Sequence, residues 1–221
     1  MDHRGTLTGV KASGRAIDYQ QIRRDLLTSY EGGAERRDQF EKQPWKLAER
    51  SGFARRLLAE GCTRMLEIGA GTGQDSEFFA SRGLQVVATD LSPAMVARCR
   101  QKGIDGRVMD FANLEFQPGT FDAVHAMNCL LHVPNAELPS VLTGIRDVLR
   151  VGGLFFLGVY SGDDEEGVTG WDEHVPPRFF SWRSDERLQQ FARESFDIVD
   201  FHIVETGTNH RFQSLTLRRP A

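Results

Sequence analysis

The sequence is poor in cysteine and lacks a long apolar run. Its three cysteines, Cys62, Cys99 and Cys129, are an odd number without C-x-x-C spacing. This pattern argues against a disulfide framework or a zinc site and favours buried thiols. The run GGLFFLGVY near the C-terminal end is too short to cross a bilayer. The first fourteen residues are polar and lack the apolar core of a signal peptide, so we expect a cytoplasmic protein.

The sequence also lacks an excess of positive charge. With 27 Lys+Arg against 31 Asp+Glu, the formal net charge is −4. No global basic field therefore recruits nucleic acid. The 221 residues are 40% hydrophobic and 26% charged, which suits one domain with a well-buried core. We predict a tail over 1–14 and a single domain over 15–221.

What the sequence does contain is a regular alternation of strand and helix patterns. Residues 15–60 predict two helices, broken near EGGA and bent near Pro44. The alternating segments follow, with strands expected at 63–69, 84–90, 105–110, 121–128 and 154–160, and helices at 73–83, 92–103 and 135–153. Alternation of this kind predicts a parallel sheet with helices on both faces.

The C-terminal part departs from this rhythm. Residues 161–181 show no clear period and are expected to form an insertion on the substrate side. A helix is expected at 184–195, then two β-rich stretches at 196–206 and 210–219 that read as a closing antiparallel pair. The predicted fold is therefore α/β, a Rossmann-like, doubly wound, mostly parallel seven-stranded sheet that ends in an antiparallel strand pair.

Three glycines separate the first expected strand from the helix after it. In MLEIGAGTGQDSEFFA, Gly69, Gly71 and Gly73 follow the acid Glu67. Glycine permits positive φ and a close approach of a ligand to the backbone. A dinucleotide fingerprint would need its third glycine at Gln74, and the acids of the following helical turn would repel a diphosphate. The spacing therefore disfavours NAD and favours a ligand without phosphate, such as S-adenosylmethionine.

From this motif onward the sequence resembles the class I S-adenosylmethionine-dependent methyltransferases, most of all small bacterial members. The resemblance spans about residues 30–160 and runs in order through five motifs: LEIGAGTG, VVATDLSPAMV, VMDFANLEF, FDAVHAMNCLLHVP and VLRVGGLFFLG. It implies a small-molecule methyltransferase that uses S-adenosylmethionine and yields S-adenosylhomocysteine.

The resemblance also implies roles for individual residues. Asp90, at a strand end, would accept hydrogen bonds from both ribose hydroxyls, and Asp110 would read the adenine amino group. Glu67 would orient the glycine loop, and Asn128 would face the methionyl portion or the acceptor. The predicted cofactor-binding residues are Glu67, Gly69, Ala70, Gly71, Gly73, Asp90, Leu91, Met95, Asp110, Phe111 and Asn128.

The acceptor side is predicted from the N-terminal helices and the insertion. Residues expected there include Tyr30, Arg36, Arg37, Trp45, Trp171, Arg178, Phe179 and Phe180, and those expected to be catalytic are His132, His174 and Tyr160. His132 is equally compatible with a packing role, whereas we read His125 as structural. No cluster has metal-ligand spacing, so we expect no metal.

The acidic insertion bears on the substrate. Residues 161–175 hold six acids and no Lys or Arg, which argues against a nucleic acid and suits a neutral or cationic small molecule. Two alternatives stay open: a tRNA-modifying methyltransferase, which predicts a basic aromatic surface, and a non-catalytic cofactor-binding protein of the same fold. The sequence gives neither the acceptor nor the oligomeric state.

Overall fold

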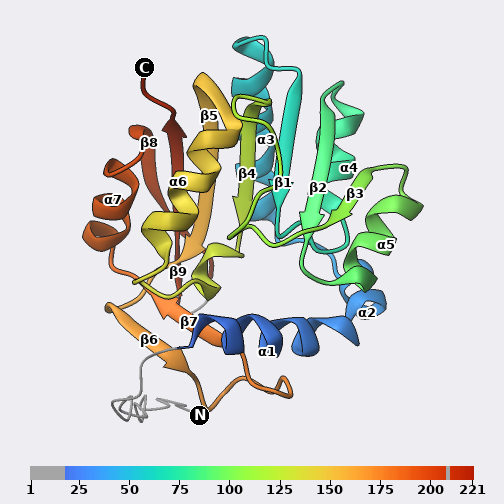
Figure 1. The fold of residues 1–221 in the computed structure, drawn as a ribbon, viewed down its shortest axis with the longest axis vertical. Helices are drawn as coiled ribbons and strands as arrows, with labels where there is room; N and C mark the ends of the chain where they lie inside the picture. The colour runs from blue at the N-terminus through green and yellow to red at the C-terminus, as the bar shows by residue number, and fades with distance from the viewer. Residues whose placement is uncertain (1–17, 208–209) are drawn as a thin grey trace.

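The computed structural model describes residues 18–207 and 210–221. The expected tail over 1–14 lies outside the described residues. A seven-stranded sheet forms the centre of the molecule, in the order β3-β2-β1-β4-β5-β9-β8 (Figure 1). Its parallel strands are β1 (Arg64–Ile68), β2 (Gln85–Asp90), β3 (Asp105–Val108), β4 (Phe121–Met127) and β5 (Leu149–Tyr160).

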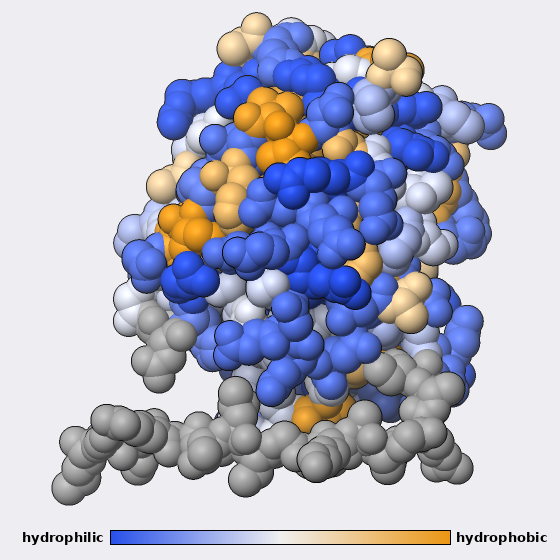
Figure 2. All heavy atoms as spheres, turned by 90° about the vertical axis from the view of Figure 1, so that its left-hand side faces the viewer, coloured by the Kyte–Doolittle hydropathy of each residue, from blue (hydrophilic) through white to orange (hydrophobic). Residues whose placement is uncertain are grey.

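The sheet closes with the antiparallel pair that the sequence predicts. Strand β9 (Arg211–Arg218) pairs antiparallel with β5 and with β8 (Asp197–Glu205). This order confirms the predicted fold class. Strand β8 forms one edge of the sheet, and the side of the molecule that carries α7 and β8 is mostly polar, with small separate apolar patches (Figure 2).

Helices cover both faces of the sheet. The helices α6 (Leu138–Val148) and α7 (Asp185–Arg193) pack on one face in a core that includes Leu66, Val124 and Phe155. The helices α3 (Pro44–Ala59) and α4 (Gln74–Ser81) pack on the other face with Met65 and Phe156. Successive residues of β1, such as Met65 and Leu66, therefore lie in opposite cores, because successive side chains of a strand point to opposite faces of the sheet. The helix α5 (Pro93–Gln101) starts as predicted, with Ser92 as its cap.

Two helices carry a proline in their first turn, and their starts differ from those that the sequence predicted. Pro44 starts α3 and does not bend a longer helix, so the described residues 18–60 form three helices, with α1 (Tyr19–Glu31) and α2 (Ala34–Asp38) before it. Helix α6 begins at Leu138, so Pro139 lies in its first turn. Proline is tolerated there because first-turn N–H groups have no intrahelical partner. Helix α6 also ends earlier than expected, since β5 already begins at Leu149.

The insertion has more structure than its sequence indicates. Strands β6 (Glu165–Val168) and β7 (Phe179–Trp182) form a separate two-stranded antiparallel sheet. It lies beside α1, which runs across the carboxyl ends of the parallel strands (Figure 1). The segment 169–178 joins the two strands, and His174 and Arg178 reach the cavity from it. None of the helices within the described ranges is long and apolar enough to cross a membrane.

Candidate active site

A cavity of about 620 Å³ lies at the carboxyl ends of the parallel strands. This is where ligands bind in open α/β sheets. One side of α1 forms its roof: Tyr19, Arg23, Leu26 and Tyr30 face the cavity at intervals of three or four residues, and Leu27 joins them. That spacing is the signal that identifies a single helix face. The sequence analysis named only Tyr30 among these five.

The three glycines of the loop after β1 serve different purposes. All have positive φ, with values of 60°, 56° and 79° at Gly69, Gly71 and Gly73. A Cβ at Gly69 would lie 2.4 Å from Cβ of Cys129, and one at Gly73 would lie 2.8 Å from Sγ of Cys99. At Gly71 nothing lies within 4 Å of such an atom. Gly69 and Gly73 thus let the loop pack closely on its neighbours, while Gly71 leaves its backbone open to the cavity.

Most predicted cofactor-binding residues are brought together in this cavity. Those that line it are Glu67, Gly69, Ala70, Gly71, Asp90, Leu91, Met95, Asp110, Phe111 and Asn128. Gly73 does not line it, because it faces Cys99 of α5. In the structure Gly73 lets the loop pack on α5, and its contact with a ligand stays a prediction.

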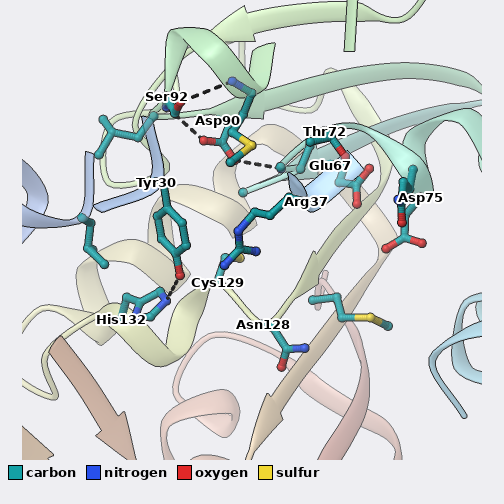
Figure 3. Close-up of a pocket in the computed structure, with 18 of the residues that line it drawn as sticks. Tyr30, Arg37, Glu67, Thr72, Asp75, Asp90, Ser92, Asn128, Cys129 and His132 are labelled. Carbon is teal, nitrogen blue, oxygen red and sulfur yellow. Dashed lines mark hydrogen bonds between the residues drawn. The ribbon is translucent and has the colours of Figure 1, made fainter. Parts of the chain in front are cut away.

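Asp90 ends β2 beside the glycine loop (Figure 3). One carboxylate oxygen accepts the N–H of Gly71 at 2.8 Å, and the other accepts the N–H of Ser92 at 2.9 Å. Burial raises the pKa of Asp90 above its ordinary value, although these two N–H groups act in the opposite direction. Each oxygen keeps a second lone pair, so the carboxylate holds the loop in place and can still accept hydrogen bonds from a ligand.

Asn128 follows β4 in a conformation that side chains rarely adopt. Its φ is 58°, and its backbone N–H donates to the carbonyl of Gly158 at 2.8 Å. Its Oδ1 is buried without a hydrogen-bond partner in the part of the chain that the structure describes. A buried polar atom without a partner is costly, and strained backbone of this kind concentrates at functional sites. The side chain of Asn128 therefore lines the cavity, and its buried Oδ1 lacks a partner among the described residues.

A buried network of polar side chains adjoins the glycine loop after β1. Glu67 accepts hydrogen bonds from Ser76 and, at 3.3 Å, from Nδ1 of His125. Asp75 of α4 pairs with Lys42 at 2.5 Å and with Arg50 at 2.9 Å. Ligand atoms of Glu67, Asp75 and His125 lie within 4.8 Å of one another, close enough to hold a metal ion. The two cationic side chains already compensate Asp75, and the absence of a metal stays a prediction.

Asp110 is engaged by the roof helix. Arg23 of α1 forms an ion pair with it, and its other oxygen accepts the N–H of Ala112 at 2.8 Å. The partner is a cation that the sequence analysis did not name. Asp110 therefore connects the ligand side of β3 to α1, and its reading of an adenine amino group stays a prediction.

On the other side of the cavity, His132 lies in the short helix η1 (Leu130–His132) and is buried. Its Nδ1 lies 2.7 Å from the carbonyl oxygen of Phe179, and its Nε2 lies 2.8 Å from Oη of Tyr30 (Figure 3). Burial lowers the pKa of His132 to about 4, so the ring is neutral near pH 7.

The insertion brings a second polar group to the same place. The carboxylate of Asp172 accepts hydrogen bonds from the backbone and guanidinium of Arg178, and Nδ1 of His174 lies 2.8 Å from it. Burial acts to raise the pKa of Asp172, but the bonds from Arg178 and His174 outweigh it and hold this pKa well below its usual range. Arg178 in turn donates to Oη of Tyr30 at 3.0 Å. These hydrogen bonds join Asp172, His174 and Arg178 within the segment 169–178. Arg178 and His174 line the cavity.

Several residues predicted for the acceptor side lie elsewhere. Tyr160 does not line the cavity and packs against Trp45 and Phe212, at ring-centroid distances of 6.2 and 5.7 Å. Its catalytic role stays a prediction, which the packing of its ring does not support. Trp171 packs in tilted contacts on Phe180 and Trp182 within the insertion, Phe180 and Trp182 stack on each other, and none of the three lines the cavity.

The charge of the cavity wall also differs from the expected acidic rim. Among the described residues, the lining holds six Lys or Arg side chains, which are Arg23, Arg36, Arg37, Lys42, Lys46 and Arg178, and five acids, which are Glu41, Glu67, Asp75, Asp90 and Asp110. Arg37 points into the middle of the group of residues in Figure 3 and lies 4.5 Å from the ring centroid of Tyr30. Burial, together with the nearby Lys42, lowers the pKa of Lys46 to about 8. The cavity lining therefore carries charge of both signs, and the acids of the insertion do not line it.

Comparisons with known proteins agree with this geometry. Residues 65–153 match a model described as a methyltransferase domain. The ubiquinone biosynthesis O-methyltransferase of Xanthomonas campestris pv. campestris is 38% identical over 101 residues, which cover 42% of this chain and 41% of that protein. The match thus spans less than half the length of this curated relative.

Solved structures resemble nearly the whole chain in fold. The 1,6-didemethyltoxoflavin-N1-methyltransferase of Burkholderia thailandensis, with bound S-adenosylhomocysteine, superimposes with a TM-score of 0.72 at 21% identity and covers 94% of this chain and 93% of its own. The magnesium protoporphyrin IX methyltransferase of Synechocystis PCC 6803 gives 0.70 at 19% identity and covers 91% and 100%. Residues 65–153 therefore form a methyltransferase domain, within a chain whose fold is shared by these solved methyltransferases.

Proposed function

We propose that the protein transfers a methyl group from S-adenosylmethionine to a small-molecule acceptor by in-line displacement. The observation that carries this proposal is the cavity itself, where the open backbone at Gly71, the carboxylate of Asp90 and the side chain of Asn128 converge. S-adenosylmethionine supplies an activated methyl group when bound.

The residues present fit such a cofactor. Asp90 accepts hydrogen bonds from the ribose hydroxyls with the lone pairs that the loop leaves free. The apolar side chains of Leu91, Met95 and Phe111 line the cavity beside it and pack on the adenine. Asn128 Oδ1 accepts a hydrogen bond from the methionyl ammonium, which gives this buried oxygen the partner that it lacks.

The acceptor binds on the side of Tyr30, Arg37, His132 and Arg178. These residues come from three separate parts of the chain, and hydrogen bonds to Oη of Tyr30 join His132 and Arg178. Much of the catalysis is positioning and exclusion of water, because the methyl group is already activated.

Two measurements test this function. In isothermal titration, S-adenosylmethionine and S-adenosylhomocysteine should bind and NAD should not. A metabolite library incubated with S-adenosylmethionine should then reveal the acceptor by release of S-adenosylhomocysteine. Binding of NAD without binding of S-adenosylhomocysteine contradicts the proposal. Two statements remain predictions from the sequence. One is that the enzyme works in the cytoplasm, and the other is that it does not act on nucleic acid.

A further inference from the structure

The hydrogen bonds around His132 define where each proton lies. A backbone carbonyl only accepts, so the 2.7 Å contact with Phe179 requires a proton on Nδ1 of His132. In a neutral imidazole the other nitrogen is then a bare acceptor. Tyr30 must therefore donate its hydroxyl proton to Nε2 across the 2.8 Å contact.

The same accounting describes the oxygen of Tyr30. It donates its one proton to His132 and accepts a hydrogen bond from Arg178 at 3.0 Å. One lone pair remains, and Tyr30 lines the cavity. Both ring nitrogens of His132, in contrast, are already occupied. Thus Tyr30, and not His132, can offer an acceptor atom to a substrate without breaking a bond.

We propose that Tyr30 is the catalytic residue that contacts the methyl acceptor, that it relays the acceptor's proton to His132, and that the acceptor atom is a hydroxyl oxygen or an N–H nitrogen. This inference rests on the proposed function and deepens it. A thiolate or a carboxylate has no proton to give to this lone pair, so the site is built for a nucleophile that arrives protonated.

The proton balance of the step is as follows. The O–H or N–H bond of the acceptor breaks, its proton passes to Oη of Tyr30, and the proton of Tyr30 passes to Nε2 of His132. The electron pair left on the acceptor forms the bond to the methyl carbon, and the sulfonium sulfur keeps the pair of the bond that breaks. After the product leaves, the proton of the imidazolium returns to water by the reverse route.

The side chains around Tyr30 assist this proton relay, and the weak basicity of His132 limits the acceptors that it suits. The guanidinium of Arg178 on Oη, and that of Arg37 over the ring, stabilise negative charge on the Tyr30 oxygen while the proton moves. His132 is a weak base, because burial lowers its pKa to about 4. The relay therefore suits acidic protons, such as those of a phenol, an enol or a heteroaromatic N–H, better than the proton of an aliphatic alcohol.

Asp172 sets the relay in place. It holds Arg178 by side-chain contacts of 2.9 to 3.2 Å, and the backbone carbonyl of the neighbouring Phe179 fixes the tautomer of His132. The insertion thus acts through the relay by placing Arg178 and Phe179. We assign Asp172 a positioning role, since it contacts Arg178 and not the cavity.

The first test compares two probes that share a ring. Phenol is protonated at pH 7.5 and thiophenol is ionised, and methyl transfer to each is followed with tritiated S-adenosylmethionine. Tyr30→Phe should lower transfer to phenol by about 10²- to 10⁴-fold, the usual effect of losing a general base. Transfer to thiophenol should stay within about three-fold, because no proton needs to leave. An equal loss with both probes would overturn the proposal, because it would mean that Tyr30 only shapes the site.

The second test asks whether the two residues act as one unit. With phenol, Tyr30→Phe combined with His132→Gln should be no slower than the worse single variant, since residues that act as a unit are not additive. Fully additive losses contradict the relay.

A third measurement does not depend on turnover of either probe. In ¹⁵N-histidine-labelled protein saturated with S-adenosylhomocysteine, Nδ1 of His132 should be protonated and Nε2 bare, and Tyr30→Phe should shift the Nε2 resonance while Nδ1 stays protonated. A protonated Nε2 refutes the relay even if neither probe is methylated. Failure of S-adenosylhomocysteine to bind refutes the proposed function instead, so the two failures are distinguishable.

Discussion

The two ends of the cavity are built in different ways. The cofactor end comes from consecutive strand ends and the loops that follow them, between Glu67 and Asn128. The acceptor end combines α1, η1 and the turn before β7, so that Tyr30, His132 and Arg178 meet across sequence separations of 102 and 148 residues. The first end is local and regular, whereas the second depends on tertiary packing. Mutations should therefore separate binding of the cofactor from transfer to the acceptor.

The largest effect on folding stability is expected from protonation of His132 at low pH. Its pKa is about 4 in the folded protein against 6.5 in an unfolded chain, so the unfolded state binds more protons between these values. Stability should fall as pH drops from 6.5 to 4, by roughly 3 kcal/mol at most. The charged side chains nearest the ring are Arg178, Arg37 and Asp172. Urea unfolding at several pH values should show this slope, and His132→Gln should reduce it.

An exposed histidine is the control for that experiment. His202 has a raised pKa, because hydrogen bonds from it to Asp200 and Glu49 outweigh its partial burial. His202→Gln should not reduce the loss of stability in acid. If the two variants change the acid slope alike, the slope does not come from the acceptor end of the cavity.

At the cofactor end, Asp90→Ala should weaken binding of S-adenosylhomocysteine. The variant loses charged hydrogen-bond acceptors worth about 1–3 kcal/mol, which is about 5- to 150-fold in affinity. The matched control is Asp105→Ala, which removes an exposed acid that pairs with Arg107 outside the cavity. In isothermal titration, Asp105→Ala should bind S-adenosylhomocysteine with the dissociation constant of the wild type. An unchanged value for Asp90→Ala would place the ribose elsewhere.

The glycine loop gives a sharper distinction within the cofactor end. Gly71→Ala and Gly73→Ala both place a side chain at positive φ, which costs roughly 1–2 kcal/mol. Gly73→Ala also places a methyl group 2.8 Å from Sγ of Cys99, so it should be less stable than Gly71→Ala by about 1 kcal/mol or more. Urea midpoints measure this difference. Combining Gly73→Ala with Cys99→Ala should show favourable coupling, and strict additivity would argue against the clash.

The smallest effect is expected at Tyr160. Because its ring packs on Trp45 and Phe212 away from the cavity, Tyr160→Phe should leave transfer to any acceptor within about two-fold. The rate of S-adenosylhomocysteine release is the measurement. A loss as large as that of Tyr30→Phe would restore the catalytic role that the sequence predicted for Tyr160.

Local patterns determined the sheet and the cofactor end. Strand and helix periods, the cap at Ser92 and the glycines after β1 each act within a few residues, so they can be read from the chain directly. The acids Asp90 and Asp110 follow from the same register, because each closes or follows a parallel strand. Even there, the sequence did not distinguish Gly71, which faces the cavity, from Gly73, which faces Cys99.

Tertiary structure decided the acceptor end. The sequence could name Tyr30, His132, His174 and Arg178 as candidates, but not that His132 and Arg178 both bond to the oxygen of Tyr30. It also could not exclude Tyr160, since an aromatic residue at a strand end looks the same whether it faces a cavity or a neighbouring helix. The physical reason is that hydrogen bonds and burial between distant segments follow from packing, and packing leaves no local period in the sequence.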